Sequence, residues 1–212
     1  KKGNLVLDPL MGVGGTLIGA SLIKRKAIGI ELNNKWIKIY QKVCKLEKIA
    51  IEKTILGNAN EKLDQIKDES IDFILTDVPY WNVDKLTKTR AKKASVSKLT
   101  NFNKVRLETK DEWLENLHSI FEKCFTKLKN KKYMAVFIGD IYREKNYHIL
   151  SAELADKIST IDCFTLKANL IWFDQSKSLH VYGYPYSFVP SMIHQNILIF
   201  KKEIIDDNGK NS

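Results

Sequence analysis

Cysteine, histidine and long apolar runs are scarce in this sequence. The three cysteines, Cys44, Cys124 and Cys163, stand apart from one another in 212 residues, and none belongs to a CxxC pair. This scarcity argues against a disulfide framework or a zinc site, and it indicates buried free thiols in a reducing cytoplasm. The four histidines have no metal-ligand spacing either, so we expect no metal.

A membrane signal is also missing. No apolar run approaches the roughly 20 residues that cross a bilayer, and no signal peptide is visible. We therefore expect a cytoplasmic protein without a membrane partner. The chain begins at Lys1 rather than at a methionine, which leaves room for a segment upstream.

Acidic residues are outnumbered by basic ones. The 35 Lys and Arg against 25 Asp and Glu give a formal net charge of +10. This balance favours a polyanionic partner such as nucleic acid, although a lysine-rich solvated surface explains it as well. The clustering is more informative, because residues 82–110 hold nine Lys or Arg and a single Glu. We expect a mobile basic loop there, with a purely solvated, disordered loop as the alternative.

Short apolar segments alternate with amphipathic ones in the rest of the chain. The predicted strands are residues 4–8, 27–32, 53–60 (ending in a turn), 71–77, 132–140, 165–173 and 195–202. The predicted helices are residues 17–25, 33–48, 111–128 and 148–159. This alternation indicates an α/β fold with a parallel sheet and right-handed crossovers. We expect one catalytic domain over residues 1–205 and a frayed tail at residues 206–212.

A glycine-rich stretch, "DPLMGVGGT" (Asp8 to Thr16), follows the first predicted strand and precedes a helix. Glycines let a backbone approach a ligand closely, and a helix N-terminus offers free N–H groups. The dinucleotide fingerprint GxGxxG fits poorly, because Leu17 stands where its third glycine would be. A plain tight turn between strand and helix is the alternative.

Polar residues follow the next two strands. Glu31 ends the second strand, where an acid accepts hydrogen bonds from ribose hydroxyls, or caps the following helix. In "GNAN" (residues 57–60), Asn58 or the backbone around Ala59 is within reach of an adenine ring in the predicted fold, although a simple turn explains the same residues.

The stretch "LTDVPYW" (residues 75–81) ends the fourth strand with an acid, a stiff Val-Pro pair and two aromatic rings. The carboxyl ends of strands one, two and four meet at one edge of such a sheet. Residues 77–80 are therefore predicted to face the same crevice as Asp8 and Glu31.

Together these motifs resemble the S-adenosylmethionine-dependent amino-methyltransferases that act on adenine N6 or cytosine N4 of DNA. "DPLMGVGGT" matches their cofactor motif DPFxGxGT, and "DVPY" matches their catalytic motif Asp/Asn/Ser-Pro-Pro-Tyr/Phe. The later "FIGD", "LIWFD" and "IHQNILIFKK" resemble strands five to seven of that family. The resemblance covers most of residues 4–202. It implies a Rossmann-like class I methyltransferase fold, with a mostly parallel seven-stranded sheet and helices on both faces.

The resemblance also implies a site. The residues implied to bind S-adenosylmethionine are Asp8, Pro9, Met11, Gly12, Gly14, Thr16, Glu31, Leu32, Asn58, Ala59 and Asp77. The implied catalytic residues are Asp77, Val78, Pro79 and Tyr80. In such a site the Asp77 carboxylate and the next backbone carbonyl accept the two hydrogens of an exocyclic amine, and Tyr80 stacks on a base flipped out of the duplex. The implied nucleic-acid contacts are Trp81, Lys88, Arg90, Lys92 and Lys93, with packing of Trp81 against the basic loop as an alternative.

Three features depart from the family pattern. Val78 replaces the first proline, and Asn58 stands where the family often has an acid. The extra cofactor-binding helix and a target-recognition domain are not visible, so an upstream segment, a recognition subunit or a restriction partner is a candidate partner.

The sequence thus predicts a site-specific DNA adenine-N6 methyltransferase of a restriction-modification type. Three alternatives stay open: a cytosine-N4 DNA methyltransferase, an RNA base methyltransferase, and a non-catalytic nucleic-acid-binding subunit with Val78 as its mark of decay. An NAD-dependent oxidoreductase ranks last.

Overall fold

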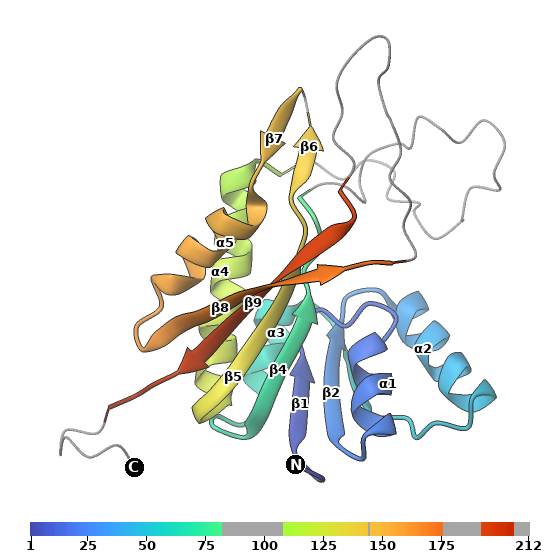
Figure 1. Cartoon of the computed structure of the whole chain (residues 1–212). Helices are drawn as coiled ribbons and strands as arrows, with labels where there is room; N and C mark the ends of the chain where they lie inside the picture. The colour runs from blue at the N-terminus through green and yellow to red at the C-terminus, as the bar shows by residue number, and fades with distance from the viewer. Residues whose placement is uncertain (82–107, 144, 176–191, 206–212) are drawn as a thin grey trace, which may run out of the picture.

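A single seven-stranded sheet organises the computed structural model, which describes residues 1–81, 108–143, 145–175 and 192–205 (Figure 1). The strand order is β3-β2-β1-β4-β5-β9-β8. Pairing is parallel from β3 to β5, and β9 runs antiparallel to both β5 and β8. The strands are β1 (Leu5–Asp8), β2 (Lys26–Glu31), β3 (Lys53–Leu56), β4 (Ile71–Asp77), β5 (Leu128–Ile138), β8 (Phe164–Phe173) and β9 (His194–Lys202). The predicted α/β class and the mostly parallel sheet are confirmed.

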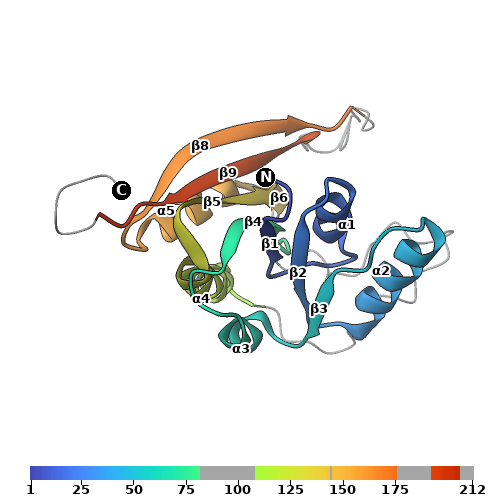
Figure 2. The ribbon, with the colours of Figure 1, turned by 90° about the horizontal axis from the view of Figure 1, so that it is seen from below.

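Helices cover both faces of the sheet, as Figure 2 shows. They are α1 (Gly15–Leu22), α2 (Asn34–Leu46), α3 (Ala59–Lys62), α4 (Lys110–Lys127) and α5 (Leu150–Ser159), with a 3₁₀ turn at Leu63–Gln65. Helices α1 and α2 lie on one face, and α3, α4 and α5 lie on the other. Buried side chains of α4 and α5, among them Phe121 and Leu154, pack on β4 and β5 to form the larger core cluster.

The structure corrects several boundaries. The basic segment does not extend to residue 110, because Thr109 caps α4 and its hydroxyl and the Glu112 carboxylate form a reciprocal capping box. Strand β5 begins at Leu128, four positions before the predicted start at residue 132. The hairpin of β6 (Ile141–Arg143) and β7 (Asn146–His148) was not predicted, nor was α3, which stands where a turn was expected. Of the three cysteines, Cys163 is exposed, so the prediction of three buried thiols is wrong there.

The glycine turn after β1 is braced by helix α2. Gly14 has a left-handed backbone (φ +81°), and a Cβ there would lie 2.4 Å from Cδ2 of Tyr40. The Tyr40 ring is fully buried, and its hydroxyl accepts a hydrogen bond from the Glu52 backbone N–H at 2.8 Å. Gly14 is therefore required both by its backbone angle and by the ring beside it.

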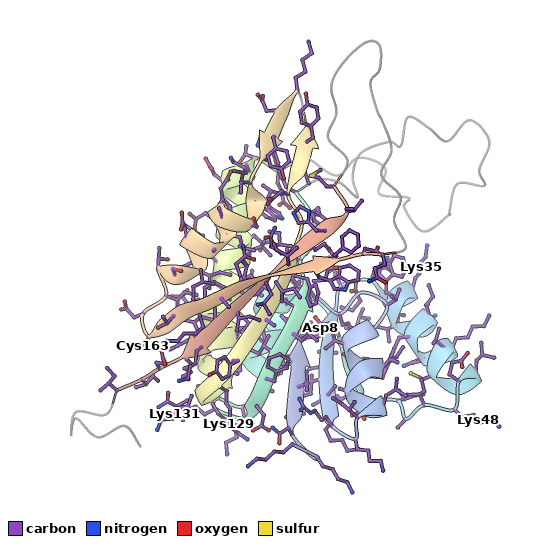
Figure 3. All side chains as sticks on the ribbon, in the orientation of Figure 1. Asp8, Lys35, Lys48, Lys129, Lys131 and Cys163 are labelled. Atoms are coloured by element: carbon purple, nitrogen blue, oxygen red, sulfur yellow. The ribbon has the colours of Figure 1, made fainter. Side chains whose placement is uncertain are left out.

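Asp8, at the end of β1, is buried beneath this turn with 3 % of its surface exposed (Figure 3). Its carboxylate accepts the backbone N–H of Leu10 at 3.2 Å. Burial raises the pKa of Asp8 to about 6, although the hydroxyls of Thr16 and Thr76 and the Leu10 N–H partly oppose this shift. The negative charge therefore costs the folded state free energy at neutral pH.

Gly14→Ala is expected to lower the free energy of unfolding by about 2 kcal/mol or more, since it adds left-handed strain and a clash with Tyr40. Gly19→Ala is the matched control, because a Cβ at Gly19 in α1 meets nothing within 4 Å. The control is expected to gain about 0.5–1 kcal/mol from helix propensity. Urea unfolding measures both, and equal effects of the two substitutions would contradict the bracing by Tyr40.

Asp8→Asn is expected to stabilise the protein at pH 8 by up to about 3 kcal/mol, the equivalent of a rise of about two pKa units. Below about pH 4 the carboxyl is protonated in both states. Between about pH 4 and 6 it ionises in the unfolded chain but stays protonated in the folded protein, so the folded state loses stability relative to the unfolded one. The gain should therefore vanish at pH 4.

Asp68→Asn is the control with the opposite expected effect on stability at pH 8. It should destabilise the protein there, because the Lys127 ammonium lowers the pKa of Asp68. Thermal unfolding from pH 4 to 8 measures both variants. A gain in Asp8→Asn that does not change with pH would contradict the buried-charge explanation.

Candidate active site

The carboxyl ends of β1, β2 and β4 meet at one edge of the sheet. Strand β1 pairs in parallel with β2 on one side and with β4 on the other, so all three end toward the same edge (Figure 1). The strand order changes direction between β1 and β4, and open α/β sheets bind ligands at such a switch point. The glycine turn, Glu31 and the segment after Asp77 are thereby brought together, as the sequence predicted.

The glycine turn leaves bare backbone at this edge. Gly12 has a positive φ of 51°, and a Cβ built on it would meet nothing within 4 Å. The Met11 backbone N–H donates to the carbonyl of Ile30 at 3.0 Å, which folds the turn over the end of β2. The Met11 side chain is buried in the core with Leu17, and Pro9 is buried as well. The Met11 carbonyl also accepts the Gly14 N–H at 2.8 Å, so both polar backbone groups of Met11 hold the turn together.

Glu31 connects the glycine turn to the start of α2. Its half-buried carboxylate accepts the backbone N–H of Asn33 at 2.7 Å. Burial raises the pKa of Glu31, while hydrogen bonds from the backbones of Asn33, Gly12 and Leu32 hold it down. The cap of α2 is Asn33 itself, whose side chain accepts from Lys35 N–H at 3.0 Å. Glu31 is therefore not the helix cap, and Leu32 beside it is exposed.

The residues after β3 have local structural partners. The Asn58 side chain accepts the Asn60 N–H at 2.9 Å and caps α3, and Ala59 is buried. The side-chain carbonyl oxygen of Asn58 is thus already hydrogen-bonded within its own turn.

The backbone of the "DVPY" segment is fixed on both sides of the Val78 carbonyl. The Val78 N–H donates to the carbonyl of Phe137 at 3.2 Å, which continues the β4–β5 pairing one residue beyond Asp77. The Pro79 carbonyl accepts the indole N–H of Trp113, in α4, at 2.9 Å. Val78 is 2 % exposed and belongs to the larger core cluster. A proline at this position would lack the N–H that Val78 uses.

Tyr80 is half-buried, and its hydroxyl accepts a hydrogen bond from the side-chain amide of Gln195 in β9. Burial raises the pKa of Tyr80, so the neutral phenol is favoured. Asp77 beside it is exposed at the edge of the sheet.

The Trp81 side chain packs against other parts of the protein. Its indole N–H donates to the carbonyl of Glu108 at 2.9 Å, and its ring meets His148 edge-on at 5.4 Å between centroids. The Arg143 guanidinium lies 4.3 Å from the ring centroid. These contacts favour the packing alternative for Trp81.

A cavity of about 510 Å³ opens beside Asp77, a size suited to a small molecule. Its walls come from α1 on one side and from strands β4, β5, β8 and β9 on the other. Most lining residues are apolar, and the polar ones near the edge include Thr16, Asp77 and Gln195.

Several predicted contacts cannot be placed. Lys88, Arg90, Lys92 and Lys93 lie outside the described residues. Within the described ranges, no three His, Cys, Asp or Glu side chains are grouped to hold a metal, and no helix is long and apolar enough to cross a membrane. Trp113 and Gln195 were missed, because amphipathic periodicity marks them only as helix and strand residues.

Comparison with known proteins gives a family match and a set of related folds. The model of a family described as DNA methylase, acting at N6 or N4, matches residues 1–42 and 71–206. A tRNA (guanine(10)-N2)-dimethyltransferase from Methanocaldococcus jannaschii is 34% identical over 87 residues, which cover 38% of this chain and 24% of that protein. The chain thus spans about a quarter of the length of this curated relative.

Two solved structures share the fold. An S-adenosylmethionine-dependent methyltransferase from Methanosarcina mazei aligns with a TM-score of 0.63 and 11% identity, over 97% of this chain and 95% of that one. TrmN from Thermus thermophilus aligns with a TM-score of 0.59 and 11% identity, over 95% and 44%. The Rossmann-like fold is confirmed, and the glycine turn at the switch point fits the cofactor of these enzymes. The chain belongs to the N6/N4 DNA methylase family, whose members are methyltransferases that use S-adenosylmethionine.

Proposed function

We propose that this protein transfers a methyl group from S-adenosylmethionine to the N6 amine of adenine in DNA. One observation carries the proposal: the "DVPY" segment lies at the same sheet edge as the glycine turn, and its backbone is held rigidly there. The match to the DNA methylase family supports DNA as the polymer.

The amine of adenine is a poor nucleophile, because its lone pair is delocalised into the ring. The Asp77 carboxylate accepts one amine hydrogen, and the Val78 carbonyl accepts the other. This pair of contacts pulls the nitrogen toward sp³ geometry and directs its lone pair at the methyl group. The N–C bond would form as the C–S bond breaks, S-adenosylhomocysteine would leave, and the amine would lose one proton to solvent. The hydrogen bonds at the Val78 N–H and the Pro79 carbonyl keep the Val78 carbonyl in place before substrate arrives. Positioning and electrostatics therefore provide most of the acceleration.

S-adenosylmethionine supplies an electrophilic methyl on a sulfonium centre. The bare backbone of Gly12 and the N-terminus of α1 would hold the cofactor, and Glu31 would accept hydrogen bonds from its ribose hydroxyls. Tyr80 stacks on the flipped base. Asp8 supports the turn from below rather than touching the ligand, since it is buried.

A second candidate is methylation of an RNA base amine. The observation that favours it is the 34% identity to a protein named as a tRNA guanine-N2 dimethyltransferase, which also acts on an exocyclic amine. The matched region covers only 24% of that relative, so DNA remains the first proposal. Cytosine is the alternative base in DNA, because the Asp77 carboxylate and the Val78 carbonyl could accept the hydrogens of its N4 amine in the same way.

Label transfer tests the proposal. The protein is incubated with radiolabelled S-adenosylmethionine and unmethylated DNA, with RNA in parallel, and the labelled nucleoside is identified after digestion. We expect N6-methyldeoxyadenosine. A label in N4-methyldeoxycytidine or in an RNA nucleoside would select an alternative, and cofactor binding without transfer would indicate a missing partner.

Asp77→Ala is expected to lower transfer at least about 100-fold, the loss typical when one preorganised transition-state contact is removed. Affinity for S-adenosylmethionine, measured by calorimetry, should stay within a few fold. Asp77→Asn is the matched control, because it keeps an acceptor oxygen and should retain measurable transfer. Full activity of Asp77→Ala would contradict the amine contact.

The basic segment is proposed to neutralise backbone phosphates. Replacing Lys92 and Lys93 by Gln should weaken DNA binding and reduce the slope of log affinity against log salt by about 2. The control replaces Lys48 and Lys131, which lie far from the carboxyl ends of the strands (Figure 3), and carries the same charge change. An unchanged slope in the Lys92/Lys93 variant would show that these side chains do not touch phosphate.

A further inference from the structure

The geometry points to Gln195 as a positioning residue that, together with the bare backbone of Gly139, fixes the ring of Tyr80. The inference deepens the proposed function and rests on it, because the ring it orients is the one proposed to stack on the base. Gln195 acts through Tyr80 and is not itself proposed to touch substrate or cofactor.

The first support is the contact between the two side chains. The Gln195 amide nitrogen donates to the Tyr80 hydroxyl, and the two residues are 115 positions apart in sequence. Gln195 also lines the cavity beside Asp77. The partly buried Tyr80 hydroxyl, which follows β4 in the chain, is thus tied to β9, the second strand from β4 in the sheet.

The second support is the space at Gly139, directly after β5. A Cβ on Gly139 would lie 2.9 Å from the Tyr80 hydroxyl oxygen and 3.0 Å from ring atom Cε1. The 2.9 Å distance is shorter than real Cβ contacts and the 3.0 Å distance is tight, so a side chain at this position would require the ring of Tyr80 to shift. The distal end of Tyr80 is therefore seated between the backbone of Gly139 and the amide of Gln195.

The third support is the anchoring of Gln195 itself. It pairs across the sheet with Trp172 of β8, and the Trp172 ring packs edge-on against Phe137 at 6.4 Å between centroids. Phe137 is also the residue whose carbonyl holds the Val78 N–H. The strand pair that presents Gln195 is thereby linked to the same part of β5 that holds the catalytic backbone.

A double-mutant cycle tests the inference. Gln195→Ala and Tyr80→Phe each remove one partner of the contact, and each should lower kcat/KM for the nucleic acid about 10-fold, the size expected when a stacking group is misplaced. The double variant should be no worse than either single one, because Gln195 acts only through the hydroxyl. The KM for S-adenosylmethionine should not change in any of them.

Two further variants complete the test. Asn169→Ala is the matched control: it removes another side-chain hydrogen bond between β8 and β9, the one from Asn169 to Asn196 at 3.1 Å, and should keep wild-type kcat/KM. Gly139→Ala should lose at least as much kcat/KM as Gln195→Ala. Full activity of Gln195→Ala, or losses that multiply in the double variant, would overturn the inference while the proposed function stands.

The four proteins of the double-mutant cycle (wild type, Gln195→Ala, Tyr80→Phe and the double variant) are also compared by thermal unfolding, a measurement that does not depend on activity. If the contact exists, the Tm shifts of Gln195→Ala and Tyr80→Phe are not additive. Absence of both label transfer and S-adenosylmethionine binding in the wild-type protein would overturn the proposed function, and additive Tm shifts would overturn the seating of Tyr80 by Gln195.

Discussion

Parallel pairing on both sides of β1 is the constraint on which the site depends. Strand β1 is only four residues long, yet it pairs with β2 and β4 and so brings three strand ends to one edge. The glycine turn follows one of these strands, Glu31 ends the second, and the "DVPY" segment follows the third. Residues far apart in sequence are thereby combined without any long loop having to place them.

The backbone after Asp77 is held by elements from three different parts of the chain. Strand β5 accepts the Val78 N–H, helix α4 donates to the Pro79 carbonyl, and β9 donates to the Tyr80 hydroxyl. Each such hydrogen bond adds only about 1 kcal/mol to stability. Their joint effect is on geometry, because they leave the segment little freedom to reorganise. This arrangement also explains how Val78 substitutes for a proline: a proline restricts φ by its ring, whereas Val78 is restrained by a strand hydrogen bond and a buried side chain.

Much of the fold could be predicted from local pattern. The sheet could be predicted from apolar runs such as those of β1, β4 and β9. The spacing of the "DPLMGVGGT" and "DVPY" motifs was sufficient to predict the edge of the sheet at which they meet. The start of α4 was also readable, since Thr109 and Glu112 have the spacing of a capping box, but the charge of the basic segment obscured it. The partners of the "DVPY" segment could not be predicted. Trp113 and Gln195 have the ordinary periodicity of a helix and a strand, and which atom each contacts depends on tertiary packing across 34 and 115 residues.

The alternation of β9 has a consequence for how this sequence can change in evolution. Leu198 and Phe200 face the core, and Gln195 faces the cavity on the opposite side of the sheet. Inserting or deleting one residue within the strand would exchange the two faces, because side chains alternate with a period of two. The length of the strand between Gln195 and Phe200 is therefore fixed. We expect aligned relatives to show gaps on either side of this interval and none inside it.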